Sequence, residues 1–120
     1  MSQRFCVSVT HAKDNQDKAT VAFVVANAAA ASEKETLVFL STEAVRLATA
    51  GYADEIHEEG FQPLKKLMDD FTANGGKIYV CSPCFKKRDL KEAELVPGAT
   101  IVGGAKLVEF LSDGVPSVSY

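Results

Sequence analysis

Short apolar runs and stretches with helical spacing alternate along this chain. The runs are rich in β-branched and aromatic residues and are bounded by polar residues, proline or glycine, which predicts strands. The run at residues 36–40 has no polar alternation, as expected of a strand covered on both faces. Pro116 places the last run at a sheet edge, because proline cannot donate to a central ladder. The five predicted strands lie within residues 4–10, 36–40, 77–81, 97–104 and 115–120.

Between these runs, apolar or small residues recur at intervals of three and four, which predicts helices. The clearest helix begins after Pro63 and ends at a glycine pair, with one apolar face formed by Leu64, Leu67, Met68 and Phe71. Ser41 and Thr42 are expected to cap another helix, which ends at Gly51. The predicted helices cover residues 17–31, 41–51, 64–73, 82–95 and 105–114.

Strands that alternate with helices in this way indicate one α/β domain spanning residues 1–120. The expected architecture is a three-layer α/β/α sandwich around a mostly parallel five-stranded sheet. Functional sites in such sheets form where the strands end and the following helices begin. The segment "KIYVCSPCFKKRD", residues 77–89, places two cysteines at such a junction.

Composition narrows the class of partner. The 120 residues are 47% hydrophobic and carry a net charge of -3 with a pI near 5.3, so no basic field is available for nucleic acid. The N-terminal residues do not resemble a signal peptide, and the most apolar window is too short to span a membrane. We therefore expect a cytoplasmic protein that binds neither nucleic acid nor membranes.

The spacing of Cys81 and Cys84 is compatible with half of a zinc site, a dithiol redox centre, a sulfur-carrying thiol with a neighbour, or two buried core thiols. A zinc site would need ligands from elsewhere, such as Cys6, His11 or His57, and we expect no metal. Cys6 lies in mid-strand and is expected in the core, whereas His57 is expected to be solvated.

The strand-to-helix junction favours a reactive thiol. Ser82 is expected as the N-cap and Pro83 as the first helical residue, so both sulfurs would lie near the positive end of the helix dipole. Lys86, Lys87 and Arg88 follow, and cations in the first turns of a helix oppose its dipole. These charges predict a thiolate with a lowered pKa and an anion nearby.

Two further features could contribute to the same site. His11 follows the first strand, so it is either a general base or hydrogen-bonding group at that edge or a solvated loop residue. Gly103 and Gly104 precede a helix but lack the spacing of a dinucleotide-binding or P-loop motif. We interpret the pair as a turn that lets the backbone approach the site.

The chain as a whole resembles the DsrE-like family, which includes DsrE/DsrF-type, TusD-type and YchN-type proteins. The resemblance rests on the segments "DKATVAFVVANAAAA", "NGGKIYVCSPCFKKRDL" and "LVPGATIVGGAKLVEFLSDG". It implies a flavodoxin-like fold, a homotrimer or hexamer, and a persulfide on Cys81, with Arg88 seven residues later. It also implies sulfur-donor and sulfur-acceptor partner proteins. No cofactor is expected.

Three functions are compatible with these features. The first is a sulfur carrier or sulfurtransferase that uses Cys81, with His11, Arg88, Gly103 and Gly104 around the substrate. Cys84 matches the second cysteine of the YchN-like branch, and a neighbouring thiol could release sulfide from a Cys81 persulfide. The second function is therefore a dithiol redox or peroxiredoxin-like protein. The third is an oligomeric interaction protein with inert thiols.

Overall fold

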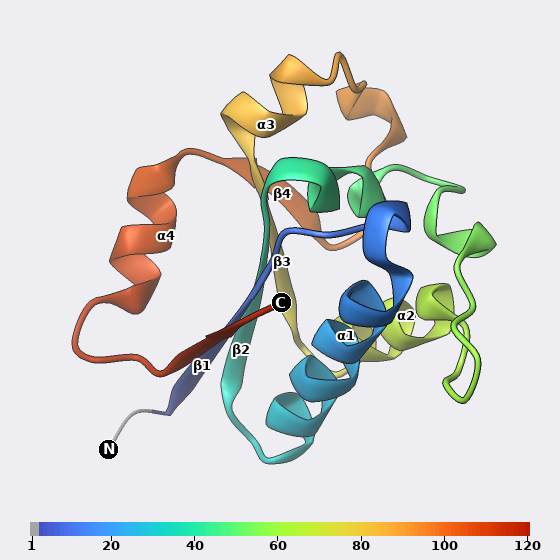
Figure 1. Ribbon diagram of the computed structural model, residues 1–120. Coiled ribbons are helices and arrows are strands. Elements are labelled where there is room, and N and C mark those ends of the chain that lie inside the picture. Colours follow the sequence, from blue (N-terminus) through green and yellow to red (C-terminus); the bar gives the residue numbers. More distant parts are fainter. Residues whose placement is uncertain (1–2) are drawn as a thin grey trace.

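A computed structural model describes residues 3–120 as a five-stranded sheet flanked by helices (Figure 1). The strand order is β4-β3-β2-β1-β5, and all four pairings are parallel, which confirms the predicted sheet and the edge position of the last strand. The strands are β1 (Arg4–Val9), β2 (Glu35–Leu40), β3 (Lys77–Cys81), β4 (Ala99–Val102) and β5 (Ser117–Ser119).

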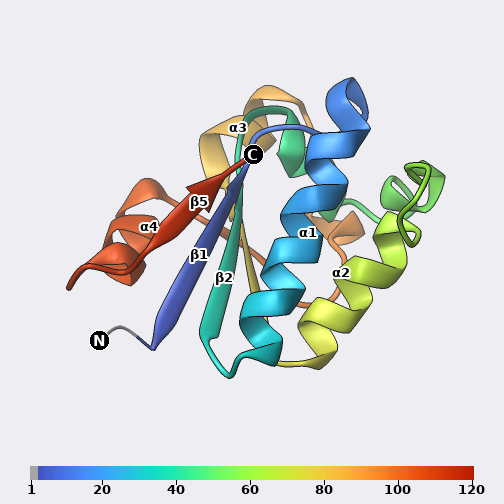
Figure 2. The same ribbon diagram turned by 60° about the horizontal axis from the view of Figure 1, so that its bottom comes forward.

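The α-helices form the outer layers. Helices α1 and α2 cover one face of the sheet, α4 covers the other, and α3 lies at the carboxyl edge (Figures 1 and 2). No helix within residues 3–120 combines the length and the apolar character needed to cross a membrane. The helices are α1 (Gln16–Ala31), α2 (Leu64–Ala73), α3 (Ser82–Lys87) and α4 (Gly104–Leu111).

The main core lies between the sheet and helices α1 and α2. Alternate residues of the central strands point into it, and small residues on α1 allow the helix to approach the sheet closely. Phe23 of α1 and Phe71 of α2 are fully buried and meet edge to face, with ring centroids 6.0 Å apart and planes at 77°. This contact joins the two helices over the sheet.

A smaller core lies under α4, where Cys6, Leu37 and Phe110 pack together. Cys6 is 1% exposed, which confirms the predicted core position. Burial raises the pKa of its thiol from the ordinary value of 9.0 to about 11, because the apolar surroundings disfavour the thiolate.

The raised pKa of Cys6 predicts a loss of stability at alkaline pH. Below about pH 9 the thiol is protonated in both states, and its contribution is fully present. Between about pH 9 and 11 the unfolded chain loses the proton first, which costs the fold on the order of 2 to 3 kcal/mol. Urea unfolding with a reductant at about pH 8 and 10.5 should show this loss. Cys6→Ala should show a smaller pH dependence, and an equal dependence in both proteins would contradict the assignment.

Two predicted helices differ from the observed elements. Residues 41–51 form a 3₁₀ helix, η2 (Thr42–Ala48), and the Ser41 side chain makes no capping hydrogen bond. Thr42 has φ of 51°, and its hydroxyl donates to the Thr10 carbonyl oxygen at 2.8 Å. This hydrogen bond joins the segments that follow β1 and β2, and it is present where the Ser41 cap was expected.

The second difference concerns the cysteine-bearing helix. α3 ends at Lys87, because Asp89 adopts a left-handed conformation with φ of 54° and the chain turns away from the helix axis. The remainder of the predicted helix contains only a short 3₁₀ turn, η4 (Glu92–Glu94). Shorter 3₁₀ turns also occur at η1 (Lys13–Asn15) and η3 (Ala53–Glu55).

The acidic segment 52–60 is only partly exposed. Asp54, Glu55 and His57 are exposed, which agrees with the solvated histidine expected from the sequence. Ala53 and Ile56, however, are buried against the main core. The segment is therefore anchored by its two apolar side chains.

Candidate functional site

The candidate site is built around the junction of β3 and α3. Cys81 is the last residue of β3 and also the N-cap of α3, with φ of -63° and ψ of 117°. The prediction of Ser82 as N-cap was wrong by one residue, because Ser82 is already the first residue of the helix. Cys84 lies in the first helical turn, as predicted. Both cysteines are free and half-buried.

The structure brings the two thiols together. The backbone N–H and the side chain of Cys84 both lie close enough to Cys81 to affect its pKa, the N–H lowering it and the side chain raising it. Both thiols pack against the edge of the main core. This arrangement leaves Cys81 with a hydrogen-bond donor and a second sulfur within reach, in a partly desolvated position.

The predicted lowering of the Cys81 pKa was wrong. Burial raises the pKa of the Cys81 thiol, and the neighbouring Cys84 side chain raises it further. The Cys84 backbone N–H and the Arg88 guanidinium lower the pKa, but they do not outweigh desolvation. At neutral pH the resting Cys81 is therefore mainly a thiol.

The expected conflict between cations and the α3 dipole is also absent. Because the helix has six residues, Lys86 and Lys87 lie in its last turn, where positive charges are favourable. Both side chains are exposed. Their presence is explained by helix stability, so they provide no evidence for a bound anion.

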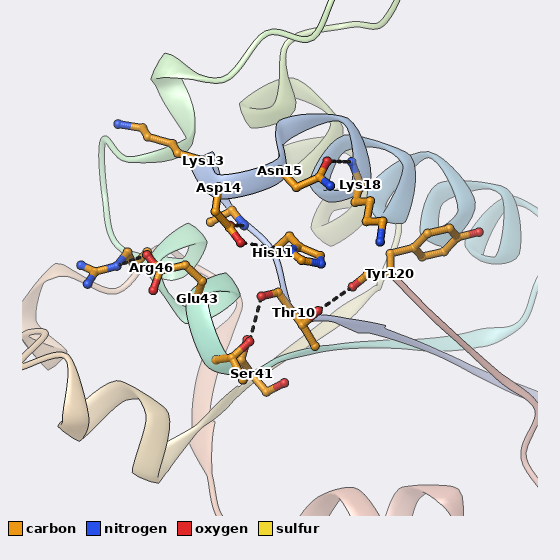
Figure 3. Close-up of polar contacts among 12 residues, drawn as sticks. Thr10, His11, Lys13, Asp14, Asn15, Lys18, Ser41, Glu43, Arg46 and Tyr120 are labelled. Atoms are coloured by element: carbon orange, nitrogen blue, oxygen red, sulfur yellow. Dashed lines mark hydrogen bonds and ion pairs between the residues drawn. The ribbon is translucent and has the colours of Figure 1, made fainter.

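Arg88 belongs to the site. It follows α3 as the C-cap residue, and its Nη1 donates to the Cys84 carbonyl oxygen at 3.2 Å. Its Nε donates to Glu43 Oε1 at 2.9 Å. Glu43 Oε2 accepts a second hydrogen bond, from Arg46 Nε at 2.7 Å. One carboxylate of η2 thus connects two guanidinium groups, and the Glu43–Arg46 pair is visible in Figure 3.

His11 lies at the same edge of the sheet, at the end of β1, but β2 separates that strand from β3. Its Nδ1 is 2.9 Å from Asp14 Oδ2, and Asp14 Oδ1 accepts from the Ala12 backbone N–H at 2.7 Å (Figure 3). The hydrogen bond from the Ala12 backbone is the main cause that lowers the pKa of the Asp14 carboxyl, and the His11 side chain lowers it further. Because an ionised carboxylate only accepts hydrogen bonds, His11 Nδ1 is the donor in this pair.

Gly103 and Gly104 lie beside the site, but the backbone at these two positions does not require glycine. Val102 pairs with Cys81 in the sheet, so Gly103 follows directly on the neighbouring strand. It is the N-cap of α4, with φ of -86°, and a Cβ added at either glycine would meet no atom within 4 Å. Their role as a close approach to a substrate remains a prediction.

In the part of the chain that the structure describes, neither a cluster of metal ligands nor the cavity described below involves the two cysteines of the candidate site. Within residues 3–120, no three His, Cys, Asp or Glu side chains gather as a metal site would require. Cys6, a suggested zinc ligand, lies in the core under α4. A surface cavity of about 560 Å³ is lined at the opposite, amino edge of the sheet by residues that include Arg4 and Glu35. It contains no thiol.

Comparison with known proteins places the chain in a family. The sequence model described as "DsrE/DsrF-like family" matches residues 3–117. The chain belongs to the DsrE/DsrF-like family. An uncharacterized protein of Methanocaldococcus jannaschii is 31% identical over 98 residues, which are 82% of this chain and 36% of that protein. The chain thus spans about a third of the length of that curated relative.

Solved structures share the DsrE/DsrF-like fold. The YchN protein from E. coli has a TM-score of 0.83 at 17% identity, with 100% of both chains covered. A protein of unknown function from Methanobacterium thermoautotrophicum has a TM-score of 0.71 at 12% identity, with 98% of both chains covered. These likenesses confirm the α/β architecture with its parallel five-stranded sheet.

Three charged residues next to the candidate site were missed from the sequence: Asp14, Glu43 and Arg46. Asp14 follows His11 by three residues, and Arg46 follows Glu43 by three, so each local pair could have been found by its spacing. The contact between Glu43 and Arg88 could not, because 45 residues separate them.

Proposed function

We propose that this chain is a sulfur carrier that receives sulfane sulfur on Cys81 as a persulfide and passes it to a partner protein. The main support is the placement of Cys81 at the end of β3, half-buried and directly before the first turn of α3, which carries Cys84. Membership of the DsrE/DsrF-like family, associated with sulfur relay, agrees with this chemistry. The cytoplasm would keep both thiols reduced.

Two exchange steps describe the transfer. The Cys81 thiolate attacks the terminal sulfur of a donor persulfide, and an S–S bond forms as the donor S–S bond breaks and the donor leaves as a thiolate. An acceptor thiolate then attacks the terminal sulfur on Cys81. That step forms the acceptor persulfide and returns Cys81 as a thiolate. Atoms and electrons balance in each step without an added oxidant or reductant.

The raised pKa of Cys81 suits a carrier that waits for its partner. A protonated thiol reacts slowly with peroxides, because oxidation follows thiolate character. Once a donor approaches, the Cys84 N–H and Arg88 stabilise the thiolate that forms. Loading from a small sulfane donor should therefore become faster as pH rises above neutrality toward the pKa of Cys81.

Contact between the two thiols favours a second candidate function. The Cys84 thiolate could attack the inner sulfur of a Cys81 persulfide, which would form a Cys81–Cys84 disulfide and release hydrosulfide. The chain would then act as a dithiol reductase. The coupling between the Cys81 and Cys84 side chains, three residues apart at the start of α3, supports this alternative.

Polysulfide treatment of the reduced protein tests the proposal. Intact mass should show one added sulfur atom, peptide mapping should place it on Cys81, and a small acceptor thiol should remove it. A disulfide as the first and sole product would support the reductase instead. Thiols that ignore both polysulfide and alkylating agents until the chain unfolds would indicate an interaction protein with inert cysteines. A homotrimer or hexamer is expected and can be measured by light scattering.

A further inference from the structure

The Glu43 carboxylate links two segments that are distant in sequence. It lies on η2, directly after β2, and binds Arg46 within the same element and Arg88 after α3. The Arg88 side chain is 17% exposed, compared with 35% for Glu43 and Arg46. The Arg88 pair is therefore the better shielded of the two and less screened by solvent.

The Arg88 side chain is held between α3 and η2 by two hydrogen bonds. Its guanidinium binds the Cys84 carbonyl through Nη1 and the Glu43 carboxylate through Nε. A free arginine side chain at a helix end would sample many rotamers, and fixing it in one geometry costs rotamer entropy. The charge-assisted hydrogen bond to Glu43 offsets this cost and fixes the Arg88 guanidinium against α3, the helix that carries Cys84.

We infer that Glu43 is a positioning residue for the sulfur chemistry, because it holds the Arg88 guanidinium against α3, the helix that begins next to Cys81. The inference rests on the proposed function of Cys81. It assigns Glu43 no contact with a substrate. Its role is to keep a mobile cation in the place where that cation acts on the sulfur.

Charge and position make opposite predictions for the loss of Glu43. Glu43 is itself negative, and the pairing with Arg88 and Arg46 holds the pKa of its carboxyl below the ordinary range. If only its charge mattered, its removal would favour the Cys81 thiolate. If it positions Arg88, its removal releases the guanidinium toward solvent and disfavours the thiolate. The sign of the change in the Cys81 pKa therefore separates the two roles.

Few other charged groups complicate this test. Cys81 is influenced by Cys84 on its own helix and by Arg88 at the helix end. Glu43 and Arg46 act from η2, the element that packs against α3. Lys86 and Lys87 are exposed in the last turn of α3. Replacing Cys84 with serine removes the coupled thiol and leaves the buried Cys6 unreactive, so alkylation reports Cys81 alone.

The test is the pH profile of iodoacetamide alkylation in Cys84→Ser protein, with and without Glu43→Ala. Loss of Glu43 should raise the Cys81 pKa and slow alkylation at neutral pH by about three- to tenfold, equivalent to half to one pKa unit. Arg46→Ala is the matched control, because it removes a guanidinium from the same carboxylate without touching Arg88, and should change the rate less than about twofold. An unchanged or lowered pKa in Glu43→Ala would overturn the inference.

Arg88 variants provide a second, fold-preserving test. Arg88→Lys keeps the charge but replaces two separate donor nitrogens, Nε and Nη1, with a single ammonium on a flexible stem, so it should raise the Cys81 pKa like Glu43→Ala. In an Arg88→Ala background, Glu43→Ala should not raise the Cys81 pKa any further. The positioning role would be refuted if Arg88→Lys had the same alkylation pH profile as the protein with Arg88. It would also be refuted if the pKa changes of Glu43→Ala and Arg88→Ala added fully in the double variant. Alkylation needs no sulfane sulfur, so these results are independent of whether polysulfide loading succeeds.

Discussion

Cys81→Ser should abolish sulfur loading from polysulfide, whereas Cys84→Ser should still acquire one sulfur atom. Serine preserves the size of the side chain at the junction of β3 and α3 but has no thiolate with which to attack sulfane sulfur. The loss should be at least about a hundredfold in rate, as expected when a nucleophile is removed. Intact mass followed by peptide mapping measures the adduct directly.

Cys84→Ser is the matched variant, because it removes the neighbouring sulfur of the same turn. If the chain is a carrier, this variant should load and then pass its sulfur to an acceptor thiol. If the chain is a reductase, the variant should accumulate persulfide and lose the release of hydrosulfide. Loading that survives Cys81→Ser would reject Cys81 as the sulfur-carrying residue.

Phe71→Ala should cost about 3 to 5 kcal/mol in the free energy of unfolding, because a fully buried ring leaves a cavity in the main core. The ring also loses its edge-to-face contact with Phe23. Such a cost is a large part of the total stability of about 5 to 15 kcal/mol that is usual for a domain. Urea unfolding followed by circular dichroism measures the change. The control is Val108→Ala on α4, where the side chain is 67% exposed and the effect should be below about 0.5 kcal/mol.

The same ring explains why residue 76 is a glycine. A Cβ added at Gly76 would overlap the ring atoms of Phe71, so Gly76→Ala should be destabilising by about 1 to 3 kcal/mol. In a Phe71→Ala background the overlap is removed, and most of this cost should disappear. Costs that simply add in the double variant would show that the two residues do not compete for the same space.

The order of elements was predictable because each depends on local pattern. Buried strands such as residues 36–40 need continuous apolar side chains, and α2 shows its buried face through helical spacing. Pro116 correctly indicated an edge strand. These features are properties of neighbouring residues, which is why the sheet and the junction that carries Cys81 agree with the sequence prediction.

The helix ends were less predictable, because they depend on backbone conformations that distant contacts stabilise. Thr42 adopts a positive φ, its hydroxyl donates to the carbonyl oxygen of Thr10 just after β1, and the segment forms a 3₁₀ helix where an α-helix was expected. Asp89 ends α3 early. The early end places Lys86 and Lys87 in the last turn and reverses the meaning of their charge.

By itself, the sequence determined the α/β fold, the five strands and the presence of a cysteine pair where a strand meets a helix. The tertiary structure decided the chemistry of that pair. Burial raises the pKa of Cys81, which no local motif indicates, because desolvation depends on segments that fold over the sulfur. Arg88 is fixed by Glu43 across 45 residues. Long-range packing thus sets the dielectric and the charge around Cys81, whereas local spacing sets only where that residue lies in the fold.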